Sequence, residues 1–322
     1  MNRLAGRFGL MLALLTATLP VMAQGYPNKP IRFVVPTSAG TATDLTARYV
    51  AERLGRDLNT SVVVENKTGA NGIIATETVA RSAPDGYTLL VAASTHYINK
   101  ALYSKLSFDP ITDFTPIARF NAAYLVLVTP KSSTTPTVAS LRQRMKAQPR
   151  TVTYSTAGSG STTHLAAALL TSTMGVEALH VPYKGGAQAL TDTIGGQVDF
   201  TFTAIAQAAP HIKADKLTPL AITSLRRTRS LPDVPTLHES GLPGFEIASR
   251  LGLMAPAGTP AEVVDRIAAA SARIANTKEF AEFCESQGLE VDFADPAAYA
   301  AAGREELQMW TRVVSISGAR VD

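Results

Sequence analysis

Two short segments rich in small and hydroxyl-bearing residues could bind an anion. Each follows an apolar, β-branched run and precedes a helical pattern: "VVPTSAGTATD" spans 34–44, and "YSTAGSGSTTH" spans 154–164. A strand–loop–helix junction of this kind presents backbone N–H groups and hydroxyls at the positive end of a helix. Neither segment contains Lys or Arg, so we expect a bound anion to meet neutral donors.

These residues lack the groups that would transform a bound anion. Ser161 and His164 stand three positions apart at a helix start, but no G-x-S-x-G elbow surrounds the serine. A P-loop needs G-x-x-x-x-G-K-[ST], and "YKGG" at 183–186 has the wrong order. "GSGSTT" has Thr163 in place of the third glycine of a dinucleotide fingerprint. No cofactor is expected, and a hydrolase working through Ser161 and His164 stands only as an alternative.

Histidine and cysteine usage argues against a metal site. The five histidines, at 96, 164, 180, 211 and 238, have no H-x-x-x-H spacing, and Cys284 is the only cysteine. One cysteine cannot form an intramolecular disulfide. Its apolar helical neighbours Phe280 and Phe283 predict that it is buried. We expect no bound metal.

The composition is that of a globular protein with a sizeable core. Of 322 residues, 46% are hydrophobic and 17% are charged, with a formal net charge of +4. Only "RRTR" at 226–229 clusters basic residues. A nucleic-acid surface needs a basic face, so no nucleic-acid partner is expected.

The first residues predict export. Arg3 and Arg7 precede a short apolar run, and "VMA" stands before Gln24. A positive segment, an apolar segment too short to span a membrane comfortably and a small-residue cleavage site are typical of a secretory signal peptide. We expect a signal peptide over 1–23, removed after Ala23. An exported protein without a disulfide fits a bacterial periplasm.

Strand and helix patterns alternate in two successive units. The first unit has apolar strands at 31–36, 61–66 and 87–93, and the second has them at 124–130, 151–156, 178–183, 198–204 and 217–223. Continuous apolar strands alternating with helices predict a mainly parallel sheet flanked by helices in each unit. At 259–262, Thr259 is predicted to cap a helix, with Pro260 as its first residue and Glu262 completing a capping box.

Two strands, near 124–130 and 250–256, are candidates to cross between the units. A chain that crosses twice forms two hinged lobes with a cleft between them. We therefore predict lobe 1 from 24–126 and 250–322, and lobe 2 from 127–249. Ligands of open parallel sheets bind beyond the carboxyl ends of the strands. The two candidate anion-binding loops, within 34–44 and 154–164, would therefore face each other across the cleft.

Long segments of the chain resemble one receptor family. These are "YPNKPIRFVVPTSAGTATDLTARYVAERL", "VVVENKTGANGIIATETVARSAPDGYTLL", "YSTAGSGSTTHLA", "HVPYKGGAQALTD", "ITSLRRTRSLPDVPTLHESGLPGFE" and "GLMAPAGTPAEVV". Together they resemble the Bug-type, or TctC-like, solute receptors of tripartite tricarboxylate transporters over nearly the entire mature chain. The resemblance implies a type II periplasmic-binding-protein fold with two hinge crossings. It also implies a periplasmic monomer, not an enzyme, that closes on a small organic carboxylate and delivers it to membrane transporter subunits.

The resemblance also assigns the ligand contacts. In the family, the loop after the first strand and the Gly/Ser-rich loop of the second lobe grip a carboxylate with the help of ordered water. Neighbouring strand-end loops, which map near 94–97 and 203–205, vary the rest of the pocket. The predicted ligand-binding residues are Thr37, Ser38, Ala39, Gly40, Thr41, Thr43, Ser94, His96, Thr156, Gly158, Ser159, Gly160, Ser161, Thr162, Thr163, Thr203 and Ala204.

The chain departs from the family pattern at two places. The first loop usually reads Pro-Pro-Gly-Gly, and here it reads Ser-Ala-Gly-Thr at 38–41; Thr203 stands where an acidic residue is often found. Asp44 is the only evident acidic partner for a ligand ammonium, and its position favours bracing the first helix. Simple organic acids are therefore favoured over amino acids. A receptor that senses its ligand and acts on a signalling partner is a further alternative.

Overall fold

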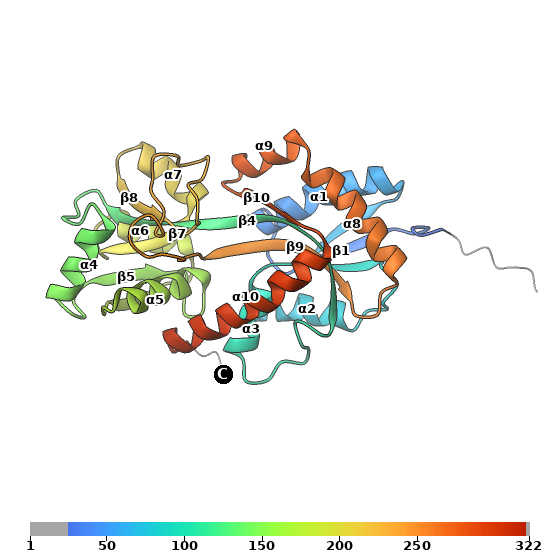
Figure 1. Ribbon diagram of the computed structural model, residues 1–322, viewed down its shortest axis with the longest axis horizontal. Coiled ribbons are helices and arrows are strands. Elements are labelled where there is room, and N and C mark those ends of the chain that lie inside the picture. The colour runs from blue at the N-terminus through green and yellow to red at the C-terminus, as the bar shows by residue number, and fades with distance from the viewer. Residues whose placement is uncertain (1–24, 320–322) are drawn as a thin grey trace, which may run out of the picture.

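The computed structural model describes residues 25–319. They form two α/β lobes joined by long strands, and helix α10 (Pro296–Ser317) lies along both (Figure 1). The predicted signal peptide at 1–23 lies outside the described residues and stays a prediction. None of the helices in residues 25–319 combines the length and the hydrophobicity of a membrane-spanning helix.

Lobe 1 is built on three parallel strands. β1 pairs in parallel with β2 on one side and with β3 on the other, and β3 pairs antiparallel with β9. The strands of this lobe are β1 (Ile31–Val35), β2 (Val62–Asn66), β3 (Thr88–Ala92), β9 (Ala248–Pro256) and β10 (Glu290–Ala294). Its helices are α1 (Ala42–Leu58), α2 (Ile73–Ala80), α3 (Thr95–Leu102), α8 (Ala261–Ala275), α9 (Lys278–Ser286) and α10 (Pro296–Ser317), with a 3₁₀ turn η1 at Ala70–Gly72.

Lobe 2 repeats the three-strand arrangement. β5 pairs in parallel with β6 and with β7, and the crossing strand β4 (Phe114–Pro130) pairs antiparallel with β7 and β8. Its strands are β5 (Thr153–Thr156), β6 (Leu179–Pro182), β7 (Phe200–Ala204) and β8 (Leu217–Ile222). Its helices are α4 (Val138–Ala147), α5 (Thr162–Met174), α6 (Gly186–Ile194) and α7 (Ile205–Lys213). The predicted two-lobed α/β class with helix-flanked sheets is confirmed.

Strand β4 (Phe114–Pro130) belongs to both lobes. Up to Tyr124 it pairs with β9, and from Leu125 it pairs with β7. The sequence indicated a strand only at 124–130, because Pro116, Arg119 and Asn121 interrupt the apolar pattern before it. The predicted lobe boundaries, after residues 126 and 249, lie near this exchange of partners and stay a prediction.

The predicted capping box at the start of α8 is wrong. The residue that caps the helix is Pro260, and it makes no side-chain capping bond. The Thr259 hydroxyl donates instead to the carbonyl oxygen of Pro256 at 2.8 Å. The proline is therefore one position earlier, relative to the helix, than the sequence pattern indicated.

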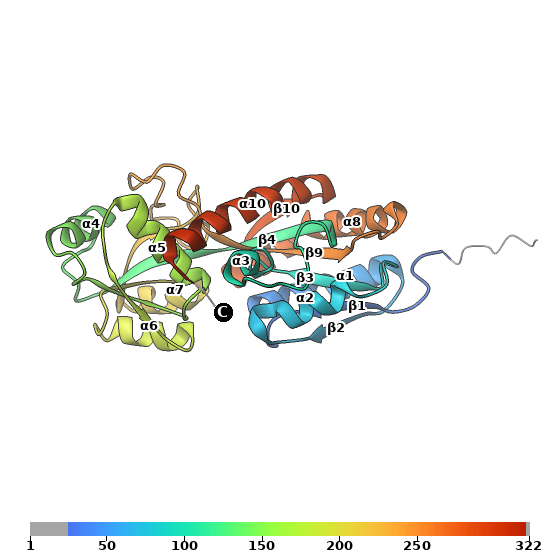
Figure 2. The ribbon, with the colours of Figure 1, turned by 90° about the horizontal axis from the view of Figure 1, so that it is seen from below.

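The hydrophobic core continues from one lobe into the other on the α10 side. One cluster packs β1, β3 and β9 against α1, α8 and α9, and it contains the buried Cys284. A second cluster runs through both lobes, and Trp310 of α10 is fully buried in it. Helix α10 contacts α3 of lobe 1 and α5 of lobe 2, so it spans the two lobes on one side of the crossing strands (Figure 2).

Candidate ligand-binding site

The loop after β1, residues 37–43, is braced by the buried carboxylate of Asp44. One carboxylate oxygen accepts the Gly40 N–H at 2.8 Å and the other accepts Asn66 Nδ2 at 2.8 Å. Arg48, one turn further along α1, forms an ion pair with the same carboxylate at 3.0 Å. Burial raises the pKa of Asp44, but the hydrogen bonds from Arg48, Gly40 and Asn66 outweigh it and hold the pKa below its usual range. The Asp44 carboxylate therefore uses its hydrogen bonds to hold loop 37–43 in place.

Helix α1 leaves backbone donors free at its start. Thr41 caps the helix by accepting the Asp44 N–H at 3.4 Å, and its hydroxyl donates to the Ser38 carbonyl at 2.9 Å. The first amides of a helix have no intrahelical acceptor. Within residues 25–319, the amides of Ala42 and Thr43 have no acceptor. The loop 38–41 is exposed, so these donors are accessible to an anion.

A neighbouring loop that the sequence did not assign to the site, 69–72, meets the end of β1. All four of its residues have positive φ, from +46° at Ala70 to +123° at Gly69. An ideal Cβ on Gly72 would lie 2.9 Å from the Pro36 side chain, so the two loops touch. Asn71 donates to Asn99 at 2.7 Å, which fixes the unusual backbone. The "GANG" turn signal could have indicated this loop, but not its contact with β1.

The loop after β5, residues 156–163, is held by its own hydroxyls. Ser161 caps α5 by accepting the His164 N–H at 3.3 Å, and its hydroxyl donates to the Gly158 carbonyl at 2.6 Å. The Ala157 N–H donates to Thr163 Oγ1 at 3.0 Å. Gly158 has φ +118°, and a Cβ there would lie 3.2 Å from the Tyr183 carbonyl oxygen. The turn therefore requires glycine at position 158.

Two stacked histidines lie beneath this loop and hold it from inside. The rings of His164 and His180 are 4.0 Å apart. His164 Nδ1 accepts the Gly160 N–H at 3.2 Å, and His180 Nε2 lies 2.7 Å from the Thr156 hydroxyl. Burial lowers the pKa of His164 to about 4, with a smaller contribution from the neighbouring His180. Burial also lowers the pKa of His180. His164 is neutral at pH 7 and its Nδ1 is an acceptor.

The hydrogen bonds of Ser161 and His164 do not support the hydrolase alternative. The Ser161 hydroxyl donates to a backbone carbonyl, and His164 Nδ1 is occupied by the Gly160 amide. A nucleophile needs its base within hydrogen-bond reach. Among the described residues of this loop, no serine hydroxyl donates to a histidine, so a Ser–His pair is not assembled. Within residues 25–319, no group of three or more His, Cys, Asp or Glu could hold a metal ion.

Free donors remain at the start of α5. The amides of Thr162 and Thr163 have no acceptor within the described part of the chain. They are the counterparts of Ala42 and Thr43 in lobe 1. Each predicted loop therefore leads to two unpaired first-turn amides.

The ends of β6 and β7 adjoin the same loop. Thr203 donates to Gln207 Oε1 at 3.1 Å, and Ala204 precedes α7 without a side-chain cap. A Cβ on Gly186, the first residue of α6, would lie 3.7 Å from Gln207 Oε1 and 3.9 Å from Ala157. Gly186 and Gln207 were missed by the sequence reasoning. The glycine pair of "YKGG", directly before a helical pattern, is the signal that could have found the first of them.

Two predicted site residues, Ser94 and His96, have buried side chains with partners inside lobe 1. The buried Ser94 hydroxyl donates to Glu306 and accepts the Arg250 N–H at 3.0 Å. His96 is buried among aromatic rings, with Nε2 2.9 Å from the Pro110 carbonyl oxygen, and burial lowers its pKa to about 4. Both side chains form their hydrogen bonds inside lobe 1, and among residues 25–319 neither forms a hydrogen bond with loop 37–43 or loop 156–163. Ligand contact by these two residues stays a prediction from the sequence alone, whereas their hydrogen bonds favour a structural role inside lobe 1, which a His96→Phe variant tests.

Two lobes, each with helix N-termini at the carboxyl ends of parallel strands, define the class of two-lobed solute-binding proteins. The family model described as the tripartite tricarboxylate transporter family receptor, TctC, matches residues 46–318. The chain belongs to this family and is a solute-binding receptor. The resemblance found in the sequence is confirmed.

Similar proteins cover almost the whole chain. BugT of Bordetella pertussis is 32% identical over an alignment of 323 positions, which covers 100% of this chain and 99% of BugT. A UPF0065 protein of Agrobacterium vitis, from the TAR-I ttuE-ttuC' intergenic region, is 35% identical over 312 residues, covering 95% of this chain and 90% of that protein.

Solved structures agree with the same assignment. An R. palustris protein with adipate has a TM-score of 0.79 at 32% identity, covering 92% of this chain and 100% of that one. MatC from Rhodopseudomonas palustris, with bound malate, has a TM-score of 0.73 at 31% identity, covering 90% of this chain and 100% of that one. Both neighbours hold a small dicarboxylate.

Proposed function

We propose that the protein is a periplasmic receptor that captures a small organic carboxylate between loops 37–43 and 156–163. It delivers the carboxylate, as a monomer, to the membrane subunits of a tripartite tricarboxylate-type transporter. The observation that carries the proposal is the pair of unpaired first-turn amides in each lobe, beside loops without Lys or Arg. Adipate and malate in two similar structures support the ligand class.

The donors suffice for useful affinity. Hydrogen bonds to a charged group are worth about 1.5–3 kcal/mol net, and a micromolar dissociation constant needs about 8 kcal/mol after all costs. Four first-turn amides, helped by hydroxyls of the two loops, reach this range once closure removes water. The exchange of strand partners in β4, between Tyr124 and Leu125, provides the hinge for closure.

The loops must keep their shape before the ligand arrives. In lobe 2, the histidine pair holds the Gly160 amide and the Thr156 hydroxyl in place. In lobe 1, Asp44 does this for Gly40. Preorganised donors cost less free energy to use than donors that must be ordered on binding. The ligand is held and released unchanged.

Titration calorimetry with adipate and malate tests the proposal. We expect one site per chain for at least one of them, and chromatography after incubation should return the ligand intact. Gly160→Leu, which places bulk in the lobe 2 loop, should weaken binding at least about a hundredfold. Ser132→Ala, on an exposed segment remote from both loops in sequence, should bind like the parent. Equal affinity in the parent and Gly160→Leu, or steady product formation, contradicts the proposal.

Export is tested separately. Cleavage between Ala23 and Gln24 follows from the positive segment, the apolar run and "VMA". The intact mass of protein recovered from the periplasm should correspond to a chain that begins at Gln24. A periplasmic species that still carries Met1 contradicts this part of the proposal.

A further inference from the structure

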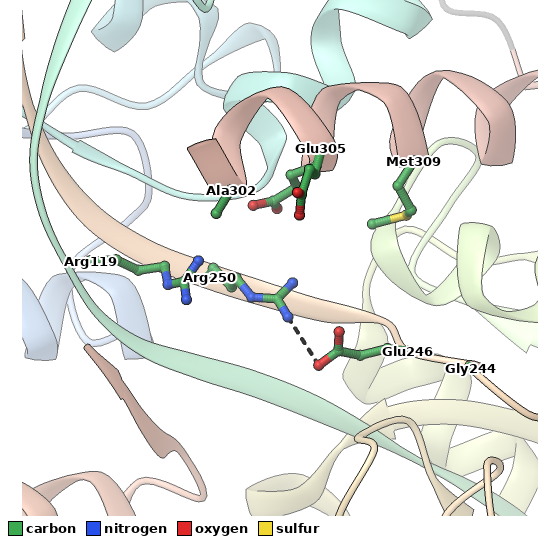
Figure 3. Close-up of a pocket in the computed structure, with 8 residues that line it drawn as sticks. Arg119, Gly244, Glu246, Arg250, Ala302, Glu305 and Met309 are labelled. Carbon is green, nitrogen blue, oxygen red and sulfur yellow. Dashed lines mark ion pairs between the residues drawn. The ribbon is translucent and has the colours of Figure 1, made fainter. Parts of the chain in front are cut away.

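A cavity of about 350 Å³, here called the hinge pocket, lies between the crossing strands and α10 (Figure 3). Its floor carries Arg119 of β4 and Arg250 of β9, and its roof carries Glu305 and Glu306 of α10. Glu246, in the segment that leads into β9, stands at one end. The hinge pocket shares no lining residue with the loops 37–43 and 156–163.

The floor presents two fixed guanidinium groups. Arg119 Nη2 lies 2.8 Å from Asp292, and Arg250 Nε lies 3.1 Å from the same carboxylate. Arg250 Nη2 pairs with Glu246 at 3.0 Å, as the dashed line in Figure 3 marks. The two side chains are only 14% and 16% exposed. Within the described residues, neither Nη1 group has an acceptor, so each guanidinium retains donors.

The roof presents a buried carboxyl group with one unused oxygen. Glu306 is 6% exposed. Its Oε1 accepts the Ser94 hydroxyl and, at 3.1 Å, the indole N–H of Trp310. Its Oε2 has no donor among residues 25–319. Burial raises the pKa of Glu306, although the bonds from Ser94 and Trp310 and the nearby Arg250 oppose the shift. The adjacent Glu305 is exposed and forms no ion pair in the described part of the chain.

Opposite charges therefore line opposite sides of the cavity without touching. In residues 25–319, no ion pair joins the roof carboxylates to the floor guanidinium groups. The floor charges are already balanced by Asp292 and Glu246. A simple dianion placed here would add negative charge beside the roof carboxylates, and a simple amine would leave the guanidinium donors unused.

We propose that the hinge pocket binds a small molecule that carries both an ammonium and a carboxylate group, that is, an amino acid. The ammonium group donates to Glu306 Oε2 and Glu305, and the carboxylate accepts from the Nη1 groups of Arg119 and Arg250. Charge-assisted bonds of this kind are the strong ones in proteins. Met309 adds an apolar contact for the connecting chain.

The indole N–H of Trp310 can report ligand binding in the hinge pocket by NMR. Trp310 is the only tryptophan in the chain, and its indole N–H donates to Glu306. The indole ¹H–¹⁵N resonance should shift saturably with 5-aminopentanoate, with one site per chain. Pentanoate and 1-aminopentane, which match its length but carry one charged group each, should bind at least about tenfold more weakly.

Variants separate the hinge pocket from the ligand loops. Glu305→Gln removes an exposed roof carboxylate and should weaken 5-aminopentanoate at least about fivefold. Glu285→Gln, at an exposed position of α9, should have no effect. Gly160→Leu should leave the indole shift intact, so this inference and the proposed function can fail separately. An absent shift at about 10 mM probe, an equal shift with pentanoate, full affinity in Glu305→Gln, or loss of the shift in Gly160→Leu overturns the proposal.

Discussion

In lobe 1, the loop 37–43 is held by the buried carboxylate of Asp44, which is paired with Arg48. In lobe 2, the loop 156–163 is held by neutral, stacked His164 and His180. Both arrangements fix a loop and leave two first-turn amides free. They differ in the free-energy penalty of losing a partner: a buried charge needs all of its partners, whereas a neutral ring needs only a hydrogen bond.

Asp44→Ala should therefore have the largest effect. It deprives the Gly40 amide, Asn66 and Arg48 of their shared acceptor. Since Arg48 is about half exposed and can turn to water, we expect a loss of about 2–3 kcal/mol in the free energy of unfolding. Affinity for the carboxylate should fall at least about tenfold. Urea denaturation and calorimetry measure the two quantities.

Glu52→Ala is the matched control for Asp44→Ala. It removes an acidic residue from the same helix, but its ion pair with Arg56 is exposed, and such pairs contribute about 0–1 kcal/mol.

The contribution of Asp44 to stability should also depend on pH. Because the folded pKa of Asp44 is lowered, this contribution is present above the unfolded carboxyl pKa and is lost as the pH falls through the folded pKa. A parent and an Asp44→Ala variant with the same stability at pH 7 would show that the carboxylate does not brace the loop.

The histidines should show a smaller effect, with a different pH window. His164→Phe keeps the ring stack but leaves the Gly160 amide without its acceptor, which costs about 1–2 kcal/mol. The folded pKa of His164, about 4, lies below its ordinary value of 6.5. The unfolded chain therefore binds the proton first, so the histidine's contribution to stability is present above pH 6.5 and is lost as the pH falls toward 4. The variant should show a shallower fall in stability over this window.

His96→Phe separates the effect of losing a buried core histidine from the effect of losing His164, which holds loop 156–163. The folded pKa of His96 is also about 4, so this variant should flatten the same stability profile. Because His96 lies among aromatic rings of lobe 1 and not beneath a loop, it should retain carboxylate affinity, whereas His164→Phe should lose about three- to tenfold. Equal affinities for the two variants would mean that the His164–Gly160 bond does not shape the binding loop.

The difference between these histidines also shows what sequence reasoning could reach. The strand–loop–helix form of both loops was predictable, because strand alternation, a small-residue loop and a helical pattern are local signals on adjacent residues. The role of His96 was not, since its surroundings come from Phe108 and Phe114, which its own helix does not reveal. The bond from Ser94 to Glu306 joins residues 212 positions apart. Contacts of that kind arise from packing and leave no pattern in one sequence.

The hinge shows the same limit. The crossing strands were found from their apolar runs, but β4 extends ten residues further toward the N-terminus than the predicted 124–130. Its polar positions, Arg119 and Asn121, are stabilised by partners from β10 and α1. A strand that pairs with both lobes can carry polar residues wherever tertiary partners exist, so periodicity alone understates its length.

Salt should have the smallest effect. Neither loop contains a basic residue, and Arg48 is already paired with Asp44. Screening weakens interactions between exposed charges, but a carboxylate bound by backbone amides has no exposed ionic partner to lose. Affinity should therefore change less than about threefold between 0.02 and 0.5 M NaCl, and calorimetry at both concentrations measures it.

Lys184 provides the sharpest form of the salt test. It is exposed and directly precedes Gly185 and Gly186, at the uncapped start of α6 beside loop 156–163. If the anion were held by charge, this lysine would be a candidate, because its neighbour Tyr183 donates its N–H to the Thr156 carbonyl oxygen and a Cβ on Gly186 would lie 3.9 Å from Ala157. We expect Lys184→Ala to lower affinity less than about twofold, because long-range attraction to a solvated ammonium is weak in water. A tenfold loss in Lys184→Ala, together with a steep fall of parent affinity with salt, would replace the neutral lobe 2 loop with an ionic one. The two lobes would then differ in how they bind the ligand, as well as in how their loops are braced.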